Sequence, residues 1–242
     1  LMKLIQRQGY LDFLRRNRER PIVKVVSGIR RCGKSTLFRL FKDELLSTGV
    51  KPEQIISINF EELEYEHLRD YHALYQYILE RMQPDQMNYI FLDEIQHVDQ
   101  FHRVVDSLFV KEHTDLYITG SNAYFMSSDI ATLLTGRYVE IQMLPLSFSE
   151  FYHSKYDGNQ YSLIPAYESY LRESSFPYTQ QLGGEDFDIQ EYLRGLYNTL
   201  LLHDVVARLK INDVTILQDI VRYIMSNIGS LLSPNKIANS LV

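Results

Sequence analysis

Hydrophobic residues recur with two different periods along the first part of the chain, and the two periods alternate. Short runs that are rich in β-branched and other apolar residues are typical of strands buried on both faces. Such runs are "PIVKVVSG" (21–28), "IISINF" (55–60), "NYIFLDE" (88–94), "DLYITGSN" (115–122) and "RYVEIQML" (137–144). Apolar residues recur at helical spacing over 3–16, 34–47, 66–82 and 101–111. The alternation predicts an α/β fold with a five-stranded parallel sheet that is flanked by helices on both faces.

The pattern changes after "PLSFSEF" (145–151). No strand-like run follows it, and apolar residues recur at helical spacing to the end of the sequence, for example over 189–209. We therefore expect a boundary near 145–152. The predicted parts are an α/β core over 1–152, a helical segment over 153–210 and a tail over 211–242.

The tail has the pattern of two helices joined by a turn. The first helix is expected over 213–228, with Gly229 as its C-terminal stop. The second is expected over 233–241, with Ser233 as its N-cap and Pro234 at its first position. Two such helices resemble the start of a helix-turn-helix, whose base-reading helix would follow next. A packing appendage of the preceding helices has the same pattern, so both interpretations stay open.

Composition narrows the class of protein but does not select a function. The 242 residues are 45% hydrophobic and 23% charged, as in a globular protein, and the net charge of −6 is not that of a wholly basic nucleic-acid binder. No apolar run approaches the roughly 20 residues that cross a bilayer, and "LMKLIQRQGY" lacks the apolar core of a signal peptide. A single cysteine, Cys32, excludes an internal disulfide framework. The expected compartment is the cytoplasm, and no membrane partner is expected.

The stretch "SGIRRCGKST" (27–36) fits the pattern G-x-x-x-x-G-K-[ST] between a predicted strand and a predicted helix. Gly28 and Gly33 allow backbone N–H groups to turn toward phosphate oxygens, and the helix N-terminus adds its dipole. Lys34 can reach the β- and γ-phosphates, and the Ser35 hydroxyl can bind Mg²⁺. Thr36 would lie near the α-phosphate. We therefore expect a phosphate-binding loop for a nucleotide.

Two carboxylates, Asp93 and Glu94, end the third predicted strand in "YIFLDEIQ" (89–96). Carboxylates at the end of a buried strand are costly unless something uses them. Beside a phosphate-binding loop, Asp93 would support Mg²⁺, and Glu94 would polarise a water for attack on the γ-phosphate. The alternative is a pair of acids that stabilise the next helix dipole.

Two further candidates follow the later strands. Asn122, or its neighbour Ser121, could bond the γ-phosphate or the attacking water, although a turn would also use Asn122 and Gly120. Ligands in such sheets bind at the carboxyl ends of the strands, where the loop, the carboxylates and Asn122 are all expected. Arg137 follows Gly136 and is a candidate cation for transition-state charge, within the chain or on a neighbour's nucleotide. A surface arginine is the equal alternative.

With these pieces in hand, the sequence resembles a family of AAA+ (P-loop) ATPases from bacteria and archaea, described as ATP-binding proteins with a C-terminal domain of unknown function. The segments that carry the resemblance are "GIRRCGKST", "FLDEIQ", "TGSNA", "LLTGRYVEIQMLPLSFSEF" and "YLRGLYNTLLLHDVVAR". The resemblance covers nearly the whole chain, and "GRYVEIQMLPLSFSEF" is its most diagnostic part. The resemblance implies an AAA+ core, a helical lid, the start of a winged-helix-like segment, and a further C-terminal domain that follows the present sequence.

The resemblance also implies roles for single residues, with ATP and Mg²⁺ as cofactors. Residues 28–36 correspond to Walker A, a segment that includes Arg30, Arg31 and Cys32. Asp93 and Glu94 correspond to Walker B, Asn122 to sensor 1 and Arg137 to an arginine finger.

Two positions around the nucleotide follow from the resemblance less directly. Ile5 and Arg7 belong to the segment before the first strand, which often lines the adenine pocket in this superfamily.

The lid departs from the family pattern, because "SSFP" (174–177) stands in place of Gly-Gly-Phe-Pro. The sensor-2 residue therefore stays open among Arg172, Arg194 and Arg208.

Two functional hypotheses result. The first is Mg²⁺-dependent hydrolysis of ATP that moves the lid and the C-terminal segment. The second is a slow ATP-dependent switch, or a binding module, that engages DNA or a protein through the C-terminal segment with little turnover. A homo-oligomer is compatible with both hypotheses, and the sequence does not name the target.

Overall fold

The computed structural model describes residues 4–121, 134, 136–156, 161–182, 186–200, 205–206 and 213–240. The chain divides into two compact units, Leu1–Asp186 and Phe187–Val242. The domain boundaries near 152 and 210 remain predictions.

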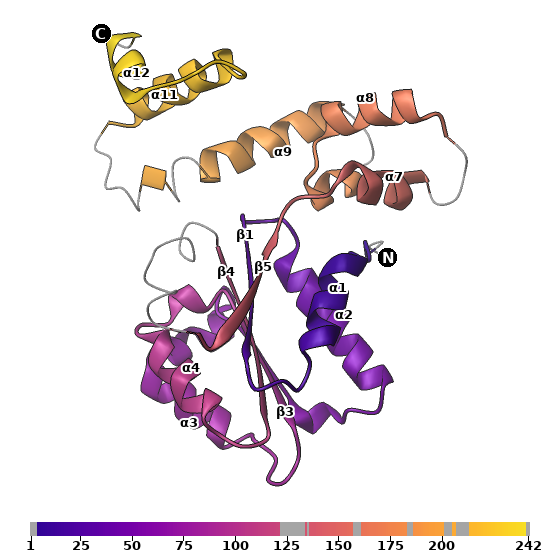
Figure 1. Cartoon of the computed structure of the whole chain (residues 1–242), viewed down its shortest axis with the longest axis vertical. Helices are drawn as coiled ribbons and strands as arrows, with labels where there is room; N and C mark the ends of the chain where they lie inside the picture. The colour runs from indigo at the N-terminus through magenta and orange to yellow at the C-terminus, as the bar shows by residue number, and fades with distance from the viewer. Residues whose placement is uncertain are drawn as a thin grey trace. The chain divides into compact units, whose positions relative to one another are not determined.

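The first unit is built on one five-stranded sheet, whose strand order is β2-β3-β4-β1-β5 (Figure 1). All four pairs of neighbouring strands are parallel, which confirms the predicted sheet. The strands are β1 (Val23–Gly28), β2 (Ile55–Asn59), β3 (Asn88–Asp93), β4 (Thr114–Ser121) and β5 (Tyr138–Met143). β1 and β3 are buried along their whole length, which is typical of strands in a parallel sheet that is covered on both faces.

Helices cover both faces of the sheet (Figure 1). The helices α1 (Gln8–Asn17) and α2 (Lys34–Ser47) pack on one face through residues such as Leu14 and Phe41, against Phe91 and Tyr117 of the strands. The helices α3 (Tyr71–Leu79) and α4 (Phe101–Phe109) pack on the other face. Alternate residues of each strand face opposite sides, so each face has its own apolar core.

The predicted helix over 3–16 begins only at Gln8 of α1, and the predicted helix over 66–82 also differs from the observed structure. The pattern predicts a single helix over 66–82, whereas the chain forms a 3-10 helix, η2 (Leu63–Arg69), followed by α3. Asp70 separates them, because its carboxylate accepts a hydrogen bond from the Ala73 N–H at 2.9 Å and so caps α3. The segments η1 (Pro52–Gln54) and η3 (Ile95–His97) are also short 3-10 helices.

The amino edge of the sheet contains a buried ion pair. Lys24 of β1 and Asp115 of β4 have no solvent exposure, and the Lys24 ammonium donates to the Asp115 carboxylate. The same carboxylate accepts hydrogen bonds from the Tyr117 hydroxyl at 2.6 Å and the Glu19 N–H at 2.8 Å. Every oxygen of the acid is thus used, which such a pair needs to offset its desolvation.

The first unit continues after β5 with α7 (Phe148–Tyr156), α8 (Leu163–Glu173) and η4 (Pro177–Gln181). Aromatic rings join α7 and α8, with ring centroids 5.1 Å apart for Phe148 and Tyr167 and 5.3 Å apart for Phe151 and Tyr170. The second unit contains α9 (Asp186–Asn198), α11 (Val214–Ser226) and α12 (Pro234–Ser240). Among the described residues, no helix has the length and apolar character needed to cross a membrane.

Candidate functional site

The polar residues predicted at strand ends meet at the carboxyl edge of the sheet. Gly28 ends β1 and pairs with Ser121 at the end of β4, while Asp93 ends β3 and pairs with Asn59 of β2. Because the strands are parallel, the loops that follow them emerge at the same edge. The structure thus brings the glycine-rich loop and the paired carboxylates together.

The loop after β1 is tight at both of its glycines. A Cβ atom on Gly28 would lie 2.5 Å from the Met143 carbonyl oxygen and 2.8 Å from the Cys32 sulfur, so no larger residue fits without a shift. Gly33 has a φ of +108°, a conformation that favours glycine. Arg31 lies between them with a φ of +63° and an exposed side chain. The backbone is thus held in a compact turn at the start of α2.

Lys34 is buried at the first position of α2 and points back across the loop. Its ammonium group donates to the carbonyl oxygens of Gly28 at 3.1 Å and Ile29 at 3.3 Å. It also lies 3.1 Å from a carboxylate oxygen of Glu94, with side-chain exposures of only 3% and 6% for the pair. The lysine therefore joins the loop to the end of β3.

Asp93 is a buried carboxylate that is held by hydroxyl groups. Burial raises the pKa of Asp93, and hydrogen bonds with the Ser35 and Thr119 hydroxyls offset part of that shift. The Thr119 hydroxyl donates to one of its oxygens. A polar hollow lined by Ser35, Lys42 and Asp93 adjoins the carboxylate. An acid in such surroundings suits a cation that approaches from the hollow.

Glu94 has a strained backbone, with φ +54° and ψ +48° in the left-handed region. A non-glycine residue there is uncommon and is held in place by its surroundings. Here the Glu94 N–H donates to the Thr119 hydroxyl oxygen at 2.9 Å, and the Gln96 amide donates to the Glu94 carboxylate. The turn directs the carboxylate toward Lys34.

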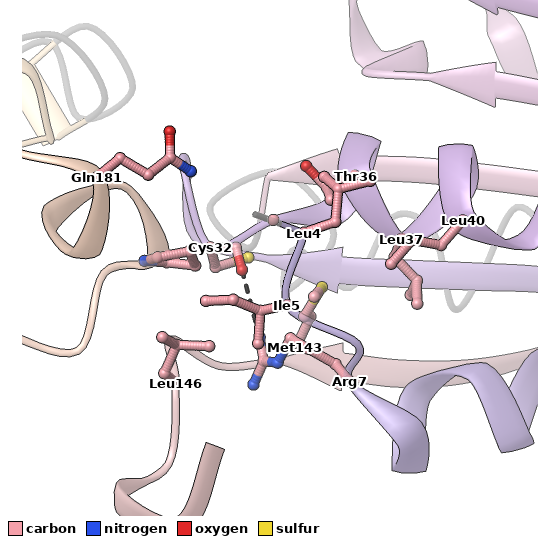
Figure 2. A pocket seen from close by; sticks show the side chains of 12 residues that line it. Leu4, Ile5, Arg7, Cys32, Thr36, Leu37, Leu40, Met143, Leu146 and Gln181 are labelled. Carbon is pink, nitrogen blue, oxygen red and sulfur yellow. Dashed lines mark hydrogen bonds between the residues drawn. The ribbon is translucent and has the colours of Figure 1, made fainter. Parts of the chain in front are cut away.

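An apolar pocket adjoins the loop and is lined in part by Leu37 and Leu40 of α2 (Figure 2). Ile5, Arg7, Cys32 and Thr36, all predicted to line the nucleotide site, belong to its wall. Its remaining side chains are mostly aliphatic, and Gln181 of η4 stands at its rim (Figure 2). The other lining residues are Leu4, Gly33, Met143, Leu146 and Pro177.

Cys32 is fully buried and faces this pocket rather than solvent. Burial raises the pKa of the Cys32 thiol, while the charges of Lys34 and Arg7 act in the opposite direction. The thiol thus packs as a small apolar group of the loop. Arg30 is half-buried beside it.

Arg137 does not join this cluster within one chain. Its carbonyl oxygen accepts the Val23 N–H, so it lies at the start of β5, at the amino edge of the sheet. Its guanidinium group lies 3.3 Å from Asp106. Five strand residues separate this edge from Gly28, a span of about 16 Å. Asn122 and Arg208 lie outside the described residues.

Sequence reasoning missed Thr119, which contacts both carboxylate residues from the neighbouring strand. A lone threonine in a buried strand gives little signal until the pairing of β3 with β4 is known.

Sequence reasoning also missed Glu150, although Ser147 and Glu150 have the S-x-x-E spacing of a capping box. In the structure, the Ser147 N–H donates to the Glu150 carboxylate at 2.8 Å, and the Glu150 N–H donates to the Ser147 hydroxyl at 3.2 Å.

A tight glycine loop, a lysine that opens a helix and a carboxylate pair at the carboxyl edge of a parallel sheet define a P-loop ATPase domain. Comparison of the sequence with family models agrees with this class. The chain belongs to the AAA domain family, whose model matches residues 20–152, more than half of the chain.

Two relatives extend the match over most of the sequence. An uncharacterized protein of Haemophilus influenzae is 38% identical over 241 residues, which are 98% of this chain and 60% of that protein. Uncharacterized protein MJ1544 of Methanocaldococcus jannaschii is 30% identical over 235 residues, which are 90% of this chain and 50% of that protein. The chain therefore spans 60% and 50% of the lengths of these two relatives.

Solved structures agree on the fold. The Walker-type ATPase PABY2304 of Pyrococcus abyssi has a TM-score of 0.60 at 15% identity, covering 98% of this chain and 89% of that one. Hsp104, in a closed state with ATPγS and casein, has a TM-score of 0.51 at 13% identity, covering 75% of this chain and 37% of that one. At these identities the likeness concerns the fold alone.

Proposed function

We propose that the chain binds ATP with Mg²⁺ and hydrolyses it, and that the nucleotide state moves the lid and the C-terminal segment. The observation that carries this proposal is the contact of Lys34 with Glu94 across the loop. It joins a phosphate-binding lysine to a carboxylate that can act as a base, next to a second carboxylate, Asp93.

The loop supplies the binding energy for the triphosphate. Backbone N–H groups of residues 28–33 and the N-terminus of α2 attract phosphate oxygens. Lys34 reaches the β- and γ-phosphates, and Thr36 lies on the α-phosphate side, where it also lines the apolar pocket. The base would occupy that pocket beside Ile5.

Asp93 and Ser35 fit a magnesium ion. The described contacts of the Asp93 carboxylate are hydroxyl groups, and the polar hollow gives access to it. Oxygen donors of this kind suit Mg²⁺, which usually keeps several waters in such sites. When bound, Mg²⁺ neutralises charge on the β- and γ-phosphates.

Glu94 is the proposed general base. It accepts a proton from water as the water oxygen bonds to the γ-phosphorus, and the bond from that phosphorus to the β–γ bridging oxygen breaks, which yields ADP and phosphate. Asn122, the proposed sensor 1, would contact the γ-phosphate or the water. Arg137 lies at the opposite edge of the sheet, so we assign it only to a neighbour's nucleotide in a homo-oligomer.

The proposal extends to the parts outside the sheet. Residues 153–210 would form the lid, with its sensor-2 arginine, and 211–242 the start of a winged-helix-like segment that engages DNA or a protein partner in the cytoplasm. The alternative is a slow switch, in which the ATP-bound state itself is the signal.

One experiment separates the two functions. Phosphate release by the purified chain is measured with ATP, with and without Mg²⁺ and with and without duplex DNA. Multiple turnovers that require Mg²⁺ support the hydrolase. Tight ATP binding with less than about one turnover per hour, the intrinsic rate of slow nucleotide switches, would support the switch. No nucleotide binding would refute both.

A further inference from the structure

Arg7 uses every hydrogen-bond donor of its guanidinium group on the protein itself. Its Nε and one Nη donate to the two carboxylate oxygens of Glu150, each at 2.9 Å. The remaining donors bond carbonyl oxygens, at 3.3 Å for Cys32, 2.6 Å for Leu144 and 3.2 Å for Pro145. A guanidinium group has five N–H donors, so none is left for a ligand.

The acceptors of Arg7 lie in three segments of the chain next to the apolar pocket. Cys32 itself lines the pocket, and Leu144 and Pro145 stand between the lining residues Met143 and Leu146. Cys32 lies in the phosphate-binding loop, and Leu144 and Pro145 lie in the link between β5 and α7. Glu150 lies in the first turn of α7. Arg7 and Ile5, two residues before it, also line the pocket, and the dashed line in Figure 2 marks the bond from Arg7 to Cys32.

The bidentate pair of Arg7 and Glu150 holds both side chains in a fixed orientation. The arginine is 5% exposed, and its guanidinium carbon lies 4.4 Å from the centre of the Tyr10 ring. Burial acts to raise the pKa of Glu150, but the hydrogen bonds from Arg7 and the Ser147 N–H outweigh it, so this pKa lies below its ordinary value. A bidentate, charge-assisted pair of this kind is strong and fixes orientation.

We propose that Arg7, through Glu150, is a positioning residue that assembles the pocket for the nucleotide base and donates no hydrogen bond to the nucleotide. The inference rests on the proposed function, since it concerns the same nucleotide. It predicts that Arg7 matters for ligands that have a base and not for the bare phosphates held by the loop.

The test compares ADP with inorganic pyrophosphate, which has the phosphates of ADP but no nucleoside. Dissociation constants for both ligands, with Mg²⁺, are measured by calorimetry for the wild-type chain and for the variants Arg7→Met, Glu150→Gln and Arg15→Met. Arg15 is the matched control, because it forms a similar bidentate pair with Glu44, at 2.6 and 2.7 Å, between α1 and α2.

We expect Arg7→Met to weaken the binding of ADP about tenfold and the binding of pyrophosphate less than about twofold. Glu150→Gln should also weaken the binding of ADP more than that of pyrophosphate, but by a smaller factor than Arg7→Met. Arg15→Met should change neither ligand. Equal weakening of both ligands, or an unchanged affinity for ADP, would overturn the inference while leaving the proposed function intact. A wild-type chain that binds neither ligand contradicts both. If Arg7→Met does not fold, as judged by circular dichroism, the ratio measured with Glu150→Gln decides.

Discussion

Lys34 and Glu94 form a buried ion pair, 3.1 Å apart, between the phosphate-binding loop and the end of β3. A phosphate that binds in the loop competes with Glu94 for the same ammonium group. We therefore expect nucleotide binding and the position of the Glu94 carboxylate to be coupled in this site.

Thr119 should affect turnover more than nucleotide affinity. Its hydroxyl donates to Asp93 and accepts from the Glu94 N–H, so Thr119→Val leaves both groups without that partner. A lost hydrogen bond to a buried charged group costs about 1.5–3 kcal/mol, which predicts a fall in kcat of about tenfold to a hundredfold. Thr119→Ser, which keeps the hydroxyl, should recover most of the rate. Steady-state kinetics test this, and a Val variant with wild-type kcat would refute the role.

Gly28→Ala should impair nucleotide binding. The added Cβ would meet the Met143 carbonyl and the Cys32 sulfur inside ordinary contact distance, so the loop must shift. We expect ATP to bind about tenfold more weakly in a fluorescent-analogue titration. Gly195→Ala is the control, because a Cβ at this position in α9 meets nothing within 4 Å. Because alanine favours the helix more than glycine does, this variant should raise the free energy of unfolding by about 0.5–1 kcal/mol. Wild-type affinity in Gly28→Ala would show that the loop is not the binding site.

Arg137→Ala should leave hydrolysis unchanged at protein concentrations where the chain is monomeric, because the residue lies at the far edge of the sheet. Any loss should appear only in the part of the rate that rises with protein concentration. The measurement is specific activity over a dilution series, with oligomeric state followed by light scattering. An equal loss at every concentration would contradict this placement.

Asp115→Asn should destabilise the first unit strongly. It leaves the Lys24 ammonium buried without its counter-charge, and breaking one partner of such a pair costs about 3–5 kcal/mol. Urea unfolding measures the change. Asp219→Asn removes the partner of an exposed arginine in α11 and should cost less than about 1 kcal/mol. A loss below about 1 kcal/mol in Asp115→Asn would mean that the buried pair does not stabilise the fold.

The sheet could be predicted from the sequence because its strands are short segments rich in β-branched and other apolar residues, which alternate with segments of helical spacing. The predicted helix over 34–47 coincides with α2, whose start is fixed by the glycine loop. The edge at which Arg137 lies could also have been deduced, since a residue that precedes a parallel strand starts at the amino edge, opposite Gly28.

Other parts of the site could not be predicted, because they depend on contacts between distant segments. Thr119 meets Asp93 only because β4 neighbours β3 in the sheet. Arg7 meets Glu150 across 143 positions of sequence, and no local pattern encodes that pairing. The capping box at Ser147 was visible in the sequence, but the pairing of its glutamate, Glu150, with Arg7 was not.

The most direct test of the account is a comparison of Glu94→Gln with Lys34→Ala. Both residues of the ion pair are altered in turn, and both ATP affinity and phosphate release are measured with Mg²⁺. We predict that Glu94→Gln binds ATP at least as well as the wild type but loses turnover by about a hundredfold or more, whereas Lys34→Ala loses ATP binding. Normal hydrolysis by Glu94→Gln would contradict the central claim that this carboxylate is the base of an ATPase.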